Sequence, residues 1–341
     1  MSQPSPVNAV PPDAPPAQAL PARRGAGPAP RKRRLIWPLI ALVAIPAVLG
    51  LALTGLRVTE ETRSAAAYGL VGRLAALGQQ VNGLAQAMED ERSATAVFIS
   101  GGRPAAGLQA LHGRYVITDN RAARVRRLVL RLGSGYPAQT RASARAVLAS
   151  INALPGLRRR AAQPQASGLA VINGYSAATS RLFPVNDGFA NPSGNSTLIT
   201  SVLALGALSR MTDQASQQQA ILRVALAQGH FGPGALTALL TAQARQASDL
   251  VSFRSSATPE ESWALTKTLA GPLARQAGTV EQQATRAGNG TLALGAGAGQ
   301  RWWGGMSYTV GWMRHAEQQL AGWITAYAQA LRQGAERYGP R

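Results

Sequence analysis

Apolar side chains recur at helical spacing along most of this chain, and no segment shows the strict alternation of a half-buried strand. Between residues 58 and 100, apolar or small residues share one helix face: Leu77, Val81, Leu84, Met88, Thr95 and Ile99. The same spacing predicts further helices at 105–131, 138–161, 166–182, 197–228, 234–256, 259–286 and 302–338. We therefore expect an all-α protein with about eight helices after residue 57.

Glycine, proline and asparagine separate these predicted helices. Gly101-Gly102-Arg103-Pro104 ends the first helix, because glycine and proline interrupt helical backbone. The segment 183–196 is rich in turn residues, and 288–300 is rich in glycine, so both are predicted loops. Short connections join antiparallel neighbours, so residues 57–338 should form two antiparallel helical bundles with their boundary near 183–196.

One stretch departs from this pattern because it is apolar on every side. Residues 35–56 contain no charged side chain, and 22 helical residues rise about 33 Å, enough for a hydrocarbon core of about 30 Å. The run is longer than that of a signal peptide, and no clear small-residue cleavage site follows. We predict one transmembrane helix. The helix at 302–338 carries charges such as Arg314 and Glu317 and cannot be a second span.

The charges beside this apolar stretch predict its orientation. Residues 1–34 are rich in proline and alanine and end in the basic cluster 31–34, so they should form a disordered basic arm. Basic residues before the span and Glu60-Glu61 after it place the N-terminus in the cytoplasm. The expected location is the cell membrane, single-pass, with the helical domain extracytoplasmic.

The net charge of +20 comes almost entirely from arginine, and the part after residue 56 keeps 29 basic against 14 acidic side chains. Such a surface attracts anions: nucleic acid, anionic lipid, cell-wall polymer or a small inorganic anion. The predicted topology opposes nucleic acid. Cysteine is absent, which excludes disulfides and thiolate metal sites. The three histidines lie on separate segments, and nucleotide and nucleophile motifs are lacking, so we expect no enzyme, no metal and no cofactor.

Arg92 is the first candidate for ligand binding. It lies in the segment 89–102, and on a helix it shares an apolar stripe with Ala85, Met88, Ala96 and Ile99. A buried guanidinium needs an anionic partner. That partner is either a protein carboxylate, such as Asp119 on the following helix, or a bound anion, and the sequence leaves both alternatives open.

A second candidate region lies within residues 212–234. Ser216, Gln219 and Arg223 fall on one face of a predicted helix and form either a solvated polar face or part of a binding site. Arg275 lies on a later helix whose faces are mixed. The arginines between 121 and 131 wind around their helix and are expected to face solvent.

Several short motifs together resemble the NIT domain, the nitrate- and nitrite-sensing helical module, most closely as it occurs in the extracytoplasmic sensor region of actinobacterial sensor histidine kinases. In order, these are Glu91-Arg92 to Phe98 with Gly101-Gly102, Thr118-Asp119, Tyr175, the stretch ASQQQAILRVALAQGHF, the turn FRSSATPEE at 253–261, and Trp303 with MRHAEQQL at 313–320. They cover roughly residues 60–335.

The resemblance implies two four-helix bundles and an anion pocket lined by arginines. Arg92 matches the first motif, whereas the family's second arginine falls on Gln219, with Arg223 one turn later; Arg275 is the third expected ligand residue, by position. The implied ligand is nitrate or nitrite, and the implied partner is a second copy or a histidine kinase of a two-component system. In kinase relatives the last helix passes the signal across the membrane. Here the sequence ends at Arg341, so we expect a free-standing receptor or the sensory half of a longer protein.

The departure at Gln219 supports an alternative function. An amide can donate a hydrogen bond but supplies no charge. The alternative is a non-catalytic helical interaction module that binds a partner protein or an anionic envelope polymer.

Overall fold

A computed structural model describes the backbone of residues 36–187 and 195–338, and the side chains of 67–185 and 195–337. The chain divides into two units, Met1–Leu56 and Arg57–Arg341. Every regular element in the described backbone is a helix, and one isolated bridge joins His230 and Thr291. The prediction of an all-α protein is therefore confirmed.

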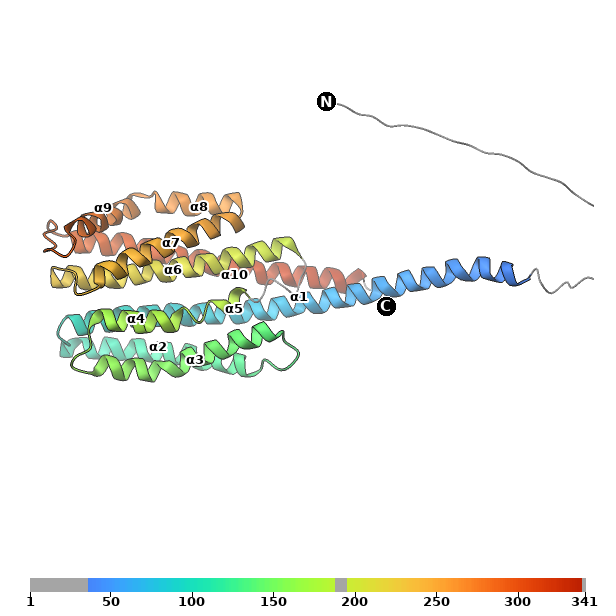
Figure 1. The fold of residues 1–341 in the computed structure, drawn as a ribbon, viewed down its shortest axis with the longest axis horizontal. Coiled ribbons are helices and arrows are strands. Elements are labelled where there is room, and N and C mark those ends of the chain that lie inside the picture. The colour runs from blue at the N-terminus through green and yellow to red at the C-terminus, as the bar shows by residue number, and fades with distance from the viewer. Residues whose placement is uncertain (1–35, 188–194, 339–341) are drawn as a thin grey trace, which may run out of the picture. The chain divides into compact units, whose positions relative to one another are not determined.

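The helices form two groups in Figure 1, and α1 (Ile36–Ser100) contributes to the first of them. That group continues with α2 (Ala105–Leu130), α3 (Ala138–Ala162), α4 (Gly168–Thr179) and the short α5 (Pro184–Asp187). The second group consists of α6 (Ser196–Gln228), α7 (Ala235–Ser256), α8 (Pro259–Leu269), α9 (Pro272–Ala287) and α10 (Ala298–Tyr338). Residues 188–194, which join the groups, are not described.

Most predicted helix ends lie within two residues of the observed ones. Helix α10 begins four residues earlier than predicted, at Ala298, inside the loop expected over 288–300, and two larger predictions are wrong. The helix expected over 259–286 is two helices, because Gly271 and Pro272 interrupt it and proline has no amide hydrogen to donate. The new helix α8 begins with a capping box in which Thr258 and Glu261 satisfy each other's backbone amides. The second error lies in the loop expected over 183–196, whose first residues form α5.

Helix α6 lies at the centre of the domain and packs against α4, α7 and α10. Between Leu198 and Ala225 it is buried on nearly all sides. The buried side chains include polar ones: Ser209, Thr212, Asp213, Ser216, Gln217, Gln218 and Gln219. A buried polar group is costly unless it is hydrogen-bonded, so the partners of these side chains show where α6 contacts the other helices through polar interactions.

Within the part of the chain whose side chains are described, no helix is long and apolar enough to cross a bilayer. The predicted span at 35–56 and the predicted arm at 1–34 lie outside that part.

Candidate functional site

Four consecutive charged residues on α1, Glu89-Asp90-Glu91-Arg92, connect the helices of the domain. Successive residues of a helix point about 100° apart, so the four side chains reach several neighbouring helices, although Glu89 and Asp90 share Arg314. Glu89, Glu91 and Arg92 are almost completely buried. Their partners come from α3, α4, α6 and α10: Arg158, Tyr175, Asp213 and Arg314.

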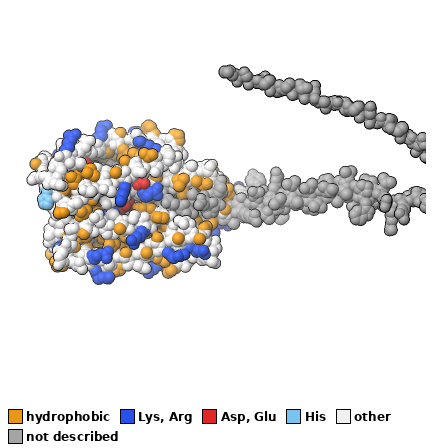
Figure 2. Space-filling model, viewed as in Figure 1, with side chains coloured by type: hydrophobic (Ala, Val, Ile, Leu, Met, Phe, Trp, Pro, Cys, Tyr) orange, Lys and Arg blue, Asp and Glu red, His pale blue; other side chains and the backbone are white. Residues whose placement is uncertain are grey.

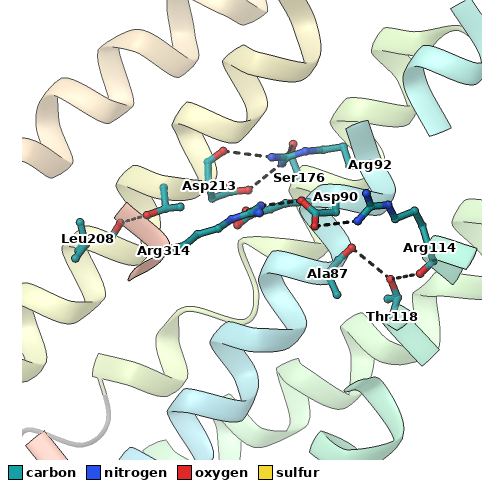
Figure 3. Close-up of polar contacts among 11 residues, drawn as sticks. Ala87, Asp90, Arg92, Arg114, Thr118, Ser176, Leu208, Asp213 and Arg314 are labelled. Atoms are coloured by element: carbon teal, nitrogen blue, oxygen red, sulfur yellow. Dashed lines mark hydrogen bonds and ion pairs between the residues drawn. The ribbon is translucent and has the colours of Figure 1, made fainter. Parts of the chain in front are cut away.

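Arg92 is fully buried and forms an ion pair with Asp213 of α6. One of its terminal nitrogens, Nη1, lies 2.8 Å from a carboxylate oxygen of Asp213 and 2.8 Å from the hydroxyl oxygen of Ser176 (Figure 3). The other terminal nitrogen donates to the backbone oxygen of Asp213 at 3.3 Å. Of the two alternatives for Arg92, the structure contains the protein carboxylate. That carboxylate is Asp213 and not Asp119, which pairs with Arg158 at 2.9 Å.

Glu91 is the second buried charged residue of α1 that pairs with other helices. Arg158 of α3 donates to both of its carboxylate oxygens at 2.9 Å, and the hydroxyl of Tyr175 donates to one of them. Burial and the negative charge of Glu91 raise the pKa of Tyr175, so its hydroxyl keeps its proton and remains a donor. These bonds fix α1 against α3 and α4.

Glu89 joins α1 to α10 through Arg314, at 2.8 Å. Burial raises its pKa to about 7, although the positive charge of Arg314 opposes the shift. One turn further along α10, burial likewise raises the pKa of Glu317 to about 7. Four neighbouring side chains partly oppose this rise: Thr212, Arg314, Gln86 and Ser209. Both carboxyls therefore titrate near neutral pH in the folded protein.

These shifts make the stability of the domain depend on pH. The folded state keeps both protons up to about pH 7, whereas the unfolded chain loses them near pH 4.5, so folding takes up protons between these values. Stability is highest below the unfolded pKa and falls as pH rises through about 7. We expect the melting temperature to be about 3 °C or more lower at pH 8 than at pH 5.5.

The variant Glu317→Gln should flatten this dependence, because glutamine stays neutral at both pH values. Glu336→Gln is the matched control, since Glu336 lies on the same helix but is exposed and pairs with Arg332. If the melting temperature of Glu317→Gln falls between pH 5.5 and pH 8 by as much as that of the wild type, Glu317 does not contribute to the pH dependence.

A polar pocket of about 230 Å³ lies beside the Glu89–Arg314 pair, between α1, α2, α6 and α10. Three arginines and one aspartate line it, so its charge is positive. The polar and aromatic lining residues are Asp90, Ser93, Arg114, Gln219, Arg223, Trp303, Ser307 and Arg314. In Figure 3, Asp90 lies between Arg314 and Arg114, at 3.0 Å from the first and 3.4 Å from the second.

Arg223 is the arginine in this pocket whose charge is not balanced. Its guanidinium lies over the ring of Trp303, 4.0 Å from the centroid, and no carboxylate within the described ranges pairs with it. Burial lowers its pKa, as expected for a partly desolvated cation without a counter-ion. The neighbouring Gln219 donates to the hydroxyl of Ser307 at 3.0 Å. The site therefore offers a cation and hydrogen-bond donors to an anion.

The structure brings together two of the four predicted ligand residues, Gln219 and Arg223. Arg92 lies in the core with Asp213, outside the residues that line the pocket. Arg275 is exposed on α9 and donates to the backbone oxygen of Ala270 at 2.9 Å. Ligand binding by the four residues stays a prediction, and only Gln219 and Arg223 have the position in this pocket that it requires.

Sequence reasoning missed Arg114 and Arg314 as residues of the pocket. Arg114 lies between the buried Leu111 and Thr118 on one face of α2. Arg314 lies at helical spacing from the buried Val310 and Glu317. The face argument that selected Arg92 would have found Arg314, a charge among buried positions of its helix, but not Arg114, whose side chain is about half exposed.

The described part of the chain is thus an all-helical domain with an arginine-lined polar pocket and with no group of potential metal ligands. The nitrate and nitrite sensing family matches residues 83–325, most of the chain. The chain belongs to this family, which confirms the resemblance read from its motifs. It is accordingly a non-catalytic sensing module.

The structure entitled "Structure of the NasR transcription antiterminator" is similar in fold. It aligns with a TM-score of 0.67 at 17% identity, covering 86% of this chain and 82% of that one. No curated protein matches the sequence.

Proposed function

We propose that this protein senses nitrate or nitrite by binding the anion in the pocket between α1, α2, α6 and α10. The observation that carries the proposal is Arg223, a partly buried guanidinium with no carboxylate partner in the described part of the chain. A buried cation without a counter-ion is costly, and a bound anion removes that cost. Membership of a nitrate- and nitrite-sensing family agrees with this choice of ligand.

Arginine suits these anions because of its shape. Nitrate is planar, and two of its oxygens can accept from the two parallel N–H groups of one guanidinium. Arg223 supplies this planar donor beside Trp303, and Gln219 and Ser307 add neutral donors. Gln219, where the family motif carries arginine, thus still contributes to the site, through its amide.

Asp90 provides a way for the anion to change the packing of the helices. Its carboxylate pairs with Arg114 of α2 and Arg314 of α10. A nitrate ion near these arginines competes with the Asp90 carboxylate for their N–H groups, which alters the contact between α1 and α10. The ligand shifts the arrangement of the helices only by the difference between its affinities for the two arrangements.

The proposal includes the membrane location inferred from the sequence: an anchor at 35–56, a cytoplasmic N-terminus and an extracytoplasmic sensor, within or beside a histidine kinase. The apolar stretch and the flanking charges support it. A reporter enzyme fused after Arg341 should be active outside the cytoplasmic membrane. Activity confined to the cytoplasm would contradict the topology.

One observation favours the alternative interaction module. An apolar groove of about 610 Å³ between α1 and α2 is lined by Arg73, Arg124, Arg127 and Arg131 and by no acidic side chain. Figure 2 shows basic side chains well in excess of acidic ones on the visible face. A groove of this kind suits an anionic polymer.

Calorimetric titration of nitrate and nitrite into the full-length protein in detergent tests the proposed function. We expect saturable binding of at least one of the two anions, with sodium chloride at the same ionic strength giving no comparable heat. If neither anion binds to protein that is folded by circular dichroism, sensing through this pocket is contradicted and the interaction module becomes the better account.

A further inference from the structure

A second polar pocket, of about 210 Å³, lies between α1, α2 and α10 and shares no lining residue with the pocket proposed for nitrate. Amide side chains dominate its wall, with one acid and one base among them. The lining residues are Gln79, Gln80, Asn82, Gly83, Gln86, Arg121, Glu317, Gln318 and Ala321.

Glu317 supplies the acid of this pocket, and it carries a negative charge above the pKa of about 7 to which burial raises it. Its side chain is 3% exposed, and its Oε1 atom has no hydrogen-bond partner in the described part of the chain. Buried carboxylate oxygens are almost always paired, so an unpaired one on a pocket wall is an acceptor available to a ligand. Arg314, one turn away, is already bound to Glu89 and Asp90.

Arg121 of α2 supplies the positive charge. It has no ion pair among the described residues, with Glu317 or with any other acid. Its guanidinium lies against the backbone of Gly83 so closely that a Cβ atom at position 83 would collide with it. The glycine therefore lets Arg121 rest on α1 at the pocket wall.

We propose that this pocket binds a small zwitterion of the α-amino-acid class, with its ammonium group on Glu317 and its carboxylate on Arg121. A simple anion would meet the Glu317 carboxylate, and a simple cation would meet the Arg121 guanidinium, whereas a ligand with both charges satisfies both. The amides of Gln79, Gln86 and Gln318 can donate to or accept from a polar ligand side chain.

The volume of the pocket agrees with this ligand class. A space of 210 Å³ is about seven times the volume of one water in the liquid, which suits a molecule of about five to ten non-hydrogen atoms. The pocket contacts α1 and α10, the two helices that the Glu89–Arg314 pair joins. An amino acid bound there would act on the same helix contact as nitrate, from a separate site.

Calorimetry of the full-length protein in detergent at pH 8, where Glu317 is ionised, with each of the twenty standard amino acids tests the proposal. We expect saturable binding of at least one small polar amino acid. Its N-acetyl derivative, which lacks the ammonium group, and its amide, which lacks the carboxylate, should each bind at least tenfold more weakly. Absence of binding by all twenty, or equal binding of either derivative, would overturn the proposal.

Variants locate the site. Arg121→Gln should weaken binding at least tenfold, and Gly83→Ala should weaken it by moving the Arg121 side chain. Arg124→Gln, one turn along α2 and outside this pocket, is the control and should bind as wild type. Glu317→Gln is the second test of the ligand contacts. If this variant fails to fold, Arg121→Gln still tests the site, because Arg121 is exposed and its replacement should leave the fold intact. Unchanged affinity in Arg121→Gln would place the ligand elsewhere.

Discussion

Replacing Arg92 by alanine should destabilise the folded domain by about 3–5 kcal/mol, because the change leaves the Asp213 carboxylate buried and unpaired. The side chain of Asp213 is 2% exposed, so water cannot replace the lost partner. Desolvation already raises the pKa of Asp213, and Arg92 is the first of the groups that oppose this rise. Thermal unfolding followed by circular dichroism should show a melting temperature about 10 °C lower.

The double variant Arg92→Met/Asp213→Leu separates burial of a charge from loss of packing. Replacement of both members of a buried ion pair by apolar residues is often neutral or stabilising, so much of the lost stability should return. Arg124→Ala, an exposed arginine of α2, should melt as wild type. If Arg92→Ala keeps the wild-type melting temperature and loses only nitrate binding, then Arg92 is a ligand residue and our account of it is wrong.

The variant Arg223→Gln should lower the affinity for nitrate about 10- to 100-fold, because a hydrogen bond to a charged group contributes about 1.5–3 kcal/mol. Arg223 is partly exposed and has no carboxylate partner in the described part of the chain, so its removal leaves no buried charge behind. The protein should therefore remain folded, with a melting temperature close to that of the wild type.

Arg275→Gln is the matched control for this titration. It removes the same charge from an arginine of the same domain that lies on the exposed face of α9. We expect its nitrate affinity to equal that of the wild type. The reverse result, with weaker binding in Arg275→Gln and unchanged binding in Arg223→Gln, would place the ligand near α9 and contradict the proposed pocket.

The helices could be predicted from the sequence because their apolar residues recur with the period of a helix and their ends carry glycine, proline or capping residues. The break between α8 and α9 was missed because alanine and leucine on both sides continue the helical pattern through Gly271 and Pro272. The confirmed family was recognised from short motifs and from their order along the chain.

The partners of the charged residues could not be predicted in this way. Arg92 and Asp213 are separated by 121 positions, and the pairing depends on how α1 packs against α6. The sequence showed that Arg92 needs an anionic partner, but a nearby acid such as Asp119 was as plausible as a distant one. Gln219 and Arg223 were found because they share one face of one helix, whereas Arg114 and Arg314 come from two other helices.

The four consecutive charged residues of α1, Glu89 to Arg92, form what we call the α1 tetrad. Its three buried members suggest why the pocket lies beside this part of α1. Glu89, Glu91 and Arg92 are each held by an oppositely charged residue of another helix, so the part of α1 beside the pocket is fixed on several sides. Asp90 is the partly exposed member, and it faces the pocket. The tetrad thus combines a rigid frame with one carboxylate that a ligand can displace.

A crystal structure of the protein grown with nitrate tests the central claim most directly. We predict a planar anion within hydrogen-bond distance of the Arg223 guanidinium, in the pocket with Gln219 and Ser307, while the Arg92–Asp213 ion pair stays intact. An anion bound instead to Arg92, with Asp213 displaced, or a pocket that stays without nitrate at saturating concentration, would contradict the account.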